Sequence, residues 1–187
     1  MLPTGYNFQM QMRKRGVTVK QIETIHQYGR VYSEEPSWVR RGSRAFIVDG
    51  GKILLSHEMN TGVYLIPGGG AEGDETAAEC CAREISEETG FEVRIAEEIL
   101  EIQEHFYERL YISRYFICEI TGKGEQKLTE TEVEHGVVPE WVEIEKALEI
   151  FGSYGDYAET DDEIEGQYCR EYTAIKYFLD YNSSSAL

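Results

Sequence analysis

The chain has 187 residues and a mass of 21.5 kDa, which is enough for one domain with a full hydrophobic core and a short added element at each end. Its formal net charge of −17 and its pI near 4.6 give a field that repels phosphate, so general binding to polymeric nucleic acid or to an anionic membrane is not expected. The four cysteines lack the spacing of a zinc site or a disulfide scaffold, and we interpret them as reduced thiols.

Residues 1–38 are predicted to form an N-terminal extension with one extra strand. Residues 17–25 alternate between apolar and polar side chains, which favours a strand, and residues 27–38 are interpreted as a connection into the core. The basic run at 13–15 is not followed by an apolar segment, and no stretch is long enough to span a bilayer. We therefore expect a cytoplasmic protein.

The core is predicted to begin with a hairpin. Residues 45–48 and 53–55 are apolar and flank Asp49-Gly50-Gly51, a strong turn signal. Residues 64–66 then form an apolar strand that runs into a glycine loop at 67–70, where the absence of side chains lets the backbone approach a ligand closely.

A helix is predicted over residues 77–89. Thr76 and Glu79 have the spacing of a capping box, and Gly90 followed by Phe91 is typical of a helix end with an apolar contact. One face of this helix is apolar and can pack on a sheet; its residues are Ala78, Cys81, Ala82 and Ile85.

The residues after this helix predict further strands and a second helix. Residues 91–103 and 109–120 are rich in Ile, Val, Tyr and Phe and predict strands, and 137–142 predicts a shorter one. Residues 144–151 have helical spacing of their apolar side chains. Strands on both sides of an amphipathic helix predict an α/β fold with a mixed sheet between helices.

The C-terminal part, residues 153–187, is predicted to be an acidic loop followed by an amphipathic helix. Residues 160–163 have capping-box form, and an apolar stripe continues to about Tyr181. The predicted organisation is therefore an N-terminal extension, a core over 39–152 and a C-terminal helical element.

Three glutamates stand close together on the helix at 77–89. Glu84, Glu87 and Glu88 have relative positions 0, +3 and +4 and fall within an arc of roughly 100°. Like charges so placed repel, so a positive charge is expected among them. Carboxylate oxygens suit Mg²⁺, which proteins usually hold with a few carboxylates together with substrate phosphates.

The complete pattern resembles a known signature. Gly69, Glu75, Arg83, Glu84, Glu87, Glu88 and Gly90, with the intervening spacing, are similar to the Nudix box of the Nudix (MutT-like) hydrolases. The resemblance implies the α/β/α sandwich of that family with a mixed β-sheet. It also implies hydrolysis of a diphosphate linkage that joins a nucleoside diphosphate to another moiety, by attack of water on phosphorus.

The resemblance further implies roles for individual residues. Glu84, Glu87 and Glu88 would ligate Mg²⁺ or Mn²⁺ and take part in catalysis, Gly69 would lie in the loop beneath the metal, and Arg83 would pair with Glu75 to brace the helix.

A general base is still required, and in the resembled family it often lies outside the box. Glu134, which precedes Pro139-Glu140-Trp141, is the candidate. Glu130, Glu132 and a glutamate of the box are the alternatives.

The substrate's other half is less determined by the sequence. Arg44, together with Arg40 and Arg41, could contact phosphate or pair with carboxylates. Tyr64 and Tyr107 could stack on a base, although strand aromatics are more often core residues. The expected partner is a nucleotide-type diphosphate, and a homodimer is possible. The alternative function is a catalytically silent Nudix-fold module that binds or senses a nucleotide.

Overall fold

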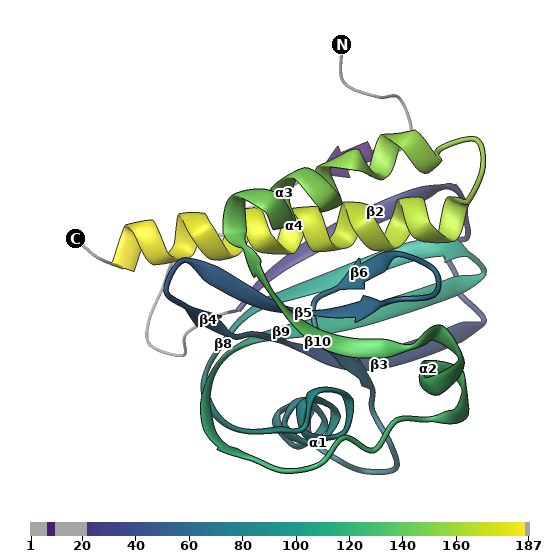
Figure 1. Cartoon of the computed structure of the whole chain (residues 1–187). Helices are drawn as coiled ribbons and strands as arrows, with labels where there is room; N and C mark the ends of the chain where they lie inside the picture. Colours follow the sequence, from purple (N-terminus) through teal and green to yellow (C-terminus); the bar gives the residue numbers. More distant parts are fainter. Residues whose placement is uncertain (1–6, 10–21, 186–187) are drawn as a thin grey trace.

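The structure is a computed structural model that describes residues 7–9 and 22–185. Its strands form two sheets, with six strands in the order β1-β2-β8-β9-β3-β7 in the larger, and β10-β5-β4 in the smaller, where β6 also pairs with β5 (Figure 1). The strands are β1 (Asn7–Gln9), β2 (Glu23–Tyr32), β3 (Trp38–Phe46), β4 (Val48–Asp49), β5 (Lys52–Glu58), β6 (Val63–Leu65), β7 (Gly68–Gly70), β8 (Phe91–Tyr107), β9 (Arg109–Lys123) and β10 (Val137–Glu143).

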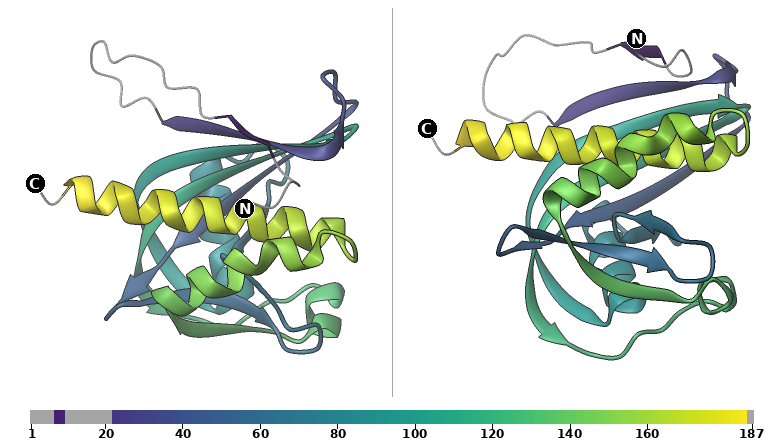
Figure 2. Two further views of the ribbon diagram at one scale, coloured as in Figure 1. Left: turned by 90° about the horizontal axis from the view of Figure 1, so that it is seen from above. Right: turned by 45° about the horizontal axis from the view of Figure 1, so that its top comes forward.

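Helices lie on both sides of the sheets. The helix α1 covers one side, and α3 and α4 lie next to each other on the opposite side (Figures 1 and 2). The larger sheet is mixed, because β2 is parallel to β8 and β3 to β9, whereas β8–β9 and β3–β7 are antiparallel. The predicted α/β/α sandwich with a mixed sheet is confirmed. The helices are α1 (Ala77–Thr89), α2 (Glu130–His135), α3 (Ile144–Gly152), the short 3₁₀ helix η1 (Ser153–Tyr157) and α4 (Asp162–Ser185).

The end of strand β3 and the residue after it are buried on both faces of the sheet. Successive side chains of a strand point to opposite faces. Ala45 and Ile47 are buried in a cluster with Cys81 and Ile85 of α1, whereas Phe46, between them, is buried in the larger cluster beneath α4. This apolar run is therefore buried on both faces, and its side chains divide between two cores.

The helix α1 has the predicted ends. Thr76 accepts a hydrogen bond from the Glu79 backbone, the Glu79 side chain accepts from the Thr76 backbone, and Gly90 closes the helix with φ +73°. The left-handed conformation of Gly90 explains why the helix stops before Phe91.

The predicted hairpin is partly confirmed. Gly50 and Gly51 both have positive φ, and Val48 and Asp49 pair with Ile53 and Lys52 around them. The preceding residues up to Phe46 leave the hairpin, however, and join the larger sheet as β3. The turn signal is local and was predictable, whereas the change of sheet depends on the distant strand β9.

The N-terminal region differs from expectation. Most of the strand predicted over 17–25 lies outside the described residues, and its last residues begin β2. Residues 27–32, expected to be a connection, belong to this strand, so that expectation is wrong. The strand is hard to recognise because Gln27, although polar, is buried and donates to Thr173 Oγ1 of α4 at 2.8 Å.

The C-terminal helix also begins differently. Asp161, rather than Thr160, caps α4: its Oδ1 accepts hydrogen bonds from the backbones of Glu163 and Ile164 at 3.1 and 3.0 Å. The expected loop contains η1. Within the described ranges, no helix has the length and apolar character needed to cross a membrane. The division of the chain at residues 38 and 152 stays a prediction.

Candidate active site

A cavity of about 310 Å³ opens on the α4 side of the larger sheet. Strands β3, β8 and β9 contribute to its lining, the first half of α4 lies across it, and the glycine strand β7 borders it next to α1. Of the sequence-predicted site residues, it is lined by Arg44, Gly69 and Glu88. The cavity thus joins the glycine loop, one glutamate of the box and the C-terminal helix.

Arg83 supplies the positive charge among the glutamates of α1. Its Nη1 donates to Glu84 Oε1 at 3.0 Å and to Glu87 Oε2 at 2.9 Å. Its Nη2 donates to Glu75 Oε1 at 2.7 Å and to the Gly70 carbonyl at 2.9 Å. The ion pair with Glu75 is present as the resemblance implied, and Arg83 also ties α1 to the glycine strand.

Gly69 faces the carboxylate of Glu84. A Cβ placed on Gly69 would lie 2.4 Å from Glu84 Oε2, so any side chain here would displace that carboxylate. Burial raises the pKa of Glu84, and the Arg83 guanidinium opposes this rise. The glycine therefore keeps one box carboxylate in contact with the loop backbone.

Glu88 has an environment unlike that of Glu87. It is only 8% exposed, and its Oε2 accepts a hydrogen bond from the Gly68 N–H at 2.8 Å. Burial raises the pKa of Glu88 to about 7, and the hydrogen bond from the Gly68 N–H opposes the rise. The side chain of Glu87 is 39% exposed. The three glutamates, equivalent in the sequence pattern, differ in their burial and in their partners.

This difference predicts a pH dependence of the metal-free protein. Because the pKa of Glu88 is raised from 4.5 to about 7, the folded state retains a proton between these pH values that the unfolded chain releases. Protonated Glu88 therefore favours the folded state fully below pH 4.5. This contribution to the free energy of unfolding is lost as the pH rises towards 7, by ~3 kcal/mol for a shift of this size. The stability of Glu88→Gln relative to the wild type should therefore be greater at pH 8 than at pH 5, as measured by urea unfolding in EDTA. If the difference in unfolding free energy between variant and wild type were the same at both pH values, the raised pKa of buried Glu88 would be contradicted.

The donor set is compatible with a hard divalent cation. In the described part of the chain, no three His, Cys, Asp or Glu side chains converge as a ready metal cluster. Glu84 and Glu88 nevertheless both contact the glycine strand, and all the ligating atoms on offer are oxygens, which Mg²⁺ and Mn²⁺ prefer. Glu87 would have to exchange the Arg83 guanidinium for the cation.

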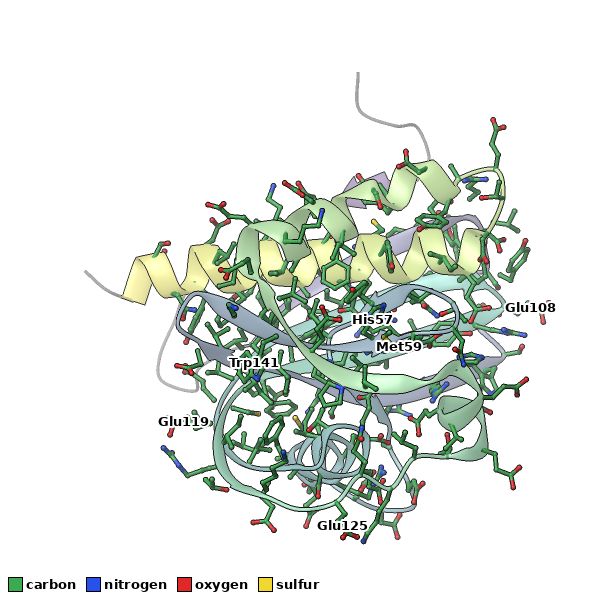
Figure 3. The ribbon with its side chains drawn as sticks, in the orientation of Figure 1. His57, Met59, Glu108, Glu119, Glu125 and Trp141 are labelled. Carbon is green, nitrogen blue, oxygen red and sulfur yellow. The ribbon has the colours of Figure 1, made fainter. Side chains whose placement is uncertain are left out.

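The three predicted substrate residues lie in different places. Arg44 lines the cavity, where it donates to the Ile66 carbonyl at 2.7 Å and lies 3.5 Å from Glu171. Tyr64 lies outside the lining and stacks on His57, with ring centres 3.9 Å apart; Figure 3 labels this histidine (Figure 3). Tyr107 is also outside the lining, and its hydroxyl is 3.2 Å from Asp162.

The predicted base lies on α2. Glu134 is exposed and does not line the cavity, whereas Glu132 does. The carboxylate of Glu132 accepts hydrogen bonds from the backbone and hydroxyl of Thr129, which caps α2. The assignment of Glu134 stays a prediction, and the geometry favours its rival Glu132.

Sequence reasoning missed a buried charged network between α4 and the sheet. Arg170 is 5% exposed and donates to Glu104 at 3.0 Å and to Glu171 at 2.7 Å, while Tyr115 is hydrogen-bonded to Glu171. Arg170 and Glu104 line the cavity. The only signal was the interruption of the apolar stripe of α4 by two adjacent opposite charges, and such residues are usually exposed.

Comparisons with known proteins bear on the family and the fold. A sequence model described as the NUDIX domain matches residues 38–163. A NUDIX hydrolase from Nitrosomonas europaea has 19% identity and a TM-score of 0.51, over 75% of this chain and 90% of that one. A MutT protein from Bacillus halodurans has 24% identity and a TM-score of 0.49, over 59% and 72%. An ADP-ribose pyrophosphatase from Streptococcus suis has 20% identity and a TM-score of 0.42, over 57% and 75%. No curated protein sequence matches this chain.

Proposed function

The chain belongs to the Nudix hydrolase family, and from this membership we propose that it hydrolyses the diphosphate linkage of a nucleoside diphosphate joined to another moiety, with Mg²⁺ or Mn²⁺ as cofactor. The main support is the position of the box. Glu84 and Glu88 lie against the glycine strand, and Glu88 lines the cavity, where a bound diphosphate could reach it.

We assign the holding of the cation to Glu84, Glu87 and Glu88. The bound ion would neutralise the anionic oxygens that make a diphosphate resist attack and would orient water towards phosphorus. Arg83 positions two of these carboxylates through Nη1 and fixes the helix to Gly70 through Nη2. The protein would thereby place carboxylates, loop and substrate cavity in one rigid arrangement before the substrate arrives.

A panel of diphosphates tests the proposal. Nucleoside triphosphates, nucleotide sugars, dinucleoside polyphosphates, ADP-ribose and coenzyme A should be assayed with Mg²⁺, with Mn²⁺ and with EDTA. We expect turnover of at least one compound with either cation and none in EDTA. Binding of a nucleotide without turnover of any compound would instead support the silent module.

The base can be located with a pair of variants. Glu132→Gln and Glu134→Gln change the same charge on one short helix, and Gln preserves the capping box of Glu132. Loss of a base should lower kcat by about 100-fold or more with a smaller change in KM. We expect this for Glu132→Gln and little change for Glu134→Gln. Wild-type pH–rate profiles in both variants would return the role to a glutamate of the box.

A further inference from the structure

We propose that Arg40 and Arg109, which line the cavity from the glycine strand outwards, form a second anion-binding subsite that selects substrates with a phosphate besides the scissile diphosphate. This inference rests on the proposed function, since it names the class of diphosphate that the site prefers. Both arginines line the cavity.

Strand register places the two arginines on one face of the sheet. Strand β3 is parallel to β9, with Trp38 opposite Arg109 and Arg40 opposite Tyr111. Side chains two residues apart on a strand share a face, and so do residues paired across neighbouring strands. The side chains of both pairs therefore point to the α4 side, as that of Arg44 does. Tyr111, opposite Arg40 in the register, contacts Trp38 and Arg109: its ring centre lies 5.3 Å from that of Trp38, and its hydroxyl accepts a hydrogen bond from Arg109 Nη1 at 3.4 Å.

The ion pairing of these two arginines differs from that of the other arginines in the cavity. Arg44 and Arg170 are each paired with Glu171, and Arg170 also with Glu104, so their charges are largely neutralised. Within the described residues, neither Arg40 nor Arg109 has a carboxylate oxygen at ion-pair distance. In a chain of net charge −17, where carboxylates outnumber cations, an arginine left without one in a cavity is well suited to an anionic ligand.

Arg40 lies beside the box, whereas Arg109 lies farther along the strands. The Arg40 guanidinium lies on the glycine strand, because a Cβ on Gly70 would be 3.0 Å from its Nη2. Arg109 pairs with Trp38, whereas Gly69 pairs with Ser43, which places Arg109 five residues of β3, or about 16 Å, beyond Gly69. The two phosphorus atoms of a diphosphate share one bridging oxygen and cannot cover that span. A separate anionic group is therefore needed to reach Arg109.

Most carboxylates of the cavity have other partners, including Asp162, which accepts a hydrogen bond from the Tyr107 hydroxyl at 3.2 Å. Glu104 is held by Arg170, Glu58 by His135 and Glu132 by Thr129. Glu163, at the start of α4, also lines the cavity, and its charge helps to raise the pKa of Arg109 after the hydrogen bond with Tyr111. Glu163 is thus a weak competitor for Arg109, and its removal should strengthen binding of the additional phosphate.

Matched ligands test the subsite directly. Coenzyme A and 3′-dephospho-coenzyme A differ by one phosphate on the nucleoside side of the diphosphate, and ADP-ribose 1″-phosphate and ADP-ribose differ by one on the other side. Calorimetry with Mg²⁺ should show the phosphorylated member of at least one pair binding about 10-fold or more tightly to the wild type. Arg40→Gln and Arg109→Gln should bring this ratio close to one, and Glu163→Gln should increase it.

Arg41→Gln is the matched control. Arg41 is the next residue on β3, carries the same charge, and by strand alternation points to the opposite face, outside the cavity. It should keep the wild-type ratio. Equal affinities within both pairs in the wild type would overturn the subsite while turnover left the hydrolase assignment intact. A preserved affinity ratio without turnover of any diphosphate would support the subsite and overturn the hydrolase assignment.

Discussion

Glu87→Gln is expected to lower turnover with Mg²⁺ by at least about 100-fold while leaving the metal-free fold almost unchanged. Glu87 is the most exposed of the three box glutamates in its side chain, and its contact in the described structure is with Arg83 of the preceding turn. Such an exposed pair contributes about 1 kcal/mol or less. Steady-state kinetics and urea unfolding in EDTA measure the two effects separately.

Glu79→Gln is the control for this variant. Glu79 carries the same charge on the same helix, and its role is in the capping box with Thr76, which Gln can also fulfil. It should retain nearly wild-type turnover. If Glu87→Gln were equally active, the metal ligand assignment would have to be abandoned. Relief of the repulsion among the box glutamates would leave the stability of Glu87→Gln unchanged or higher, and the structure favours little change because Arg83 already offsets that repulsion.

Features determined by neighbouring residues were predicted well. The helix α1 has the expected bounds because its capping box and its terminal glycine act within a single turn of chain. The turn at Gly50 and Gly51 likewise depends on two positive φ values that glycine adopts readily. The carboxylates of the box could be placed on one face because helical spacing alone brings them together.

Features determined by distant residues were not predicted. The polar strand β2 is recognisable only with α4 present, since Gln27 is buried by its bonds to Cys169 and Thr173. The exposed side of α2 could not be distinguished from its cavity side, so Glu134 was chosen as the candidate base although its rival Glu132 is the one that lines the cavity. The first half of α4 lines the cavity although its sequence indicated only an amphipathic helix.

Arg170→Met is expected to destabilise the folded protein by about 3–5 kcal/mol. The guanidinium is buried and is bonded to both Glu104 and Glu171, so its loss leaves the remaining charges of the network with an excess of one negative charge. Burial already raises the pKa of Glu104, and removal of Arg170 takes away the largest opposing influence. The loss should therefore be smaller at pH 5 than at pH 8, because a carboxyl group with a raised pKa is more easily protonated at the lower pH. Urea unfolding at pH 5 and pH 8 gives both values.

Two further variants decide whether the network is the cause. Arg94→Met removes an arginine that is 61% exposed and paired with Glu119 across β8 and β9, so it should cost about 1 kcal/mol or less. Arg170→Met combined with Glu104→Gln removes the unpaired charge and should recover part of the lost stability, because a broken ion pair costs more than an absent one. A double variant no more stable than Arg170→Met, with an unchanged loss at pH 5, would show that the side-chain packing of Arg170, rather than its charge, holds α4 on the sheet.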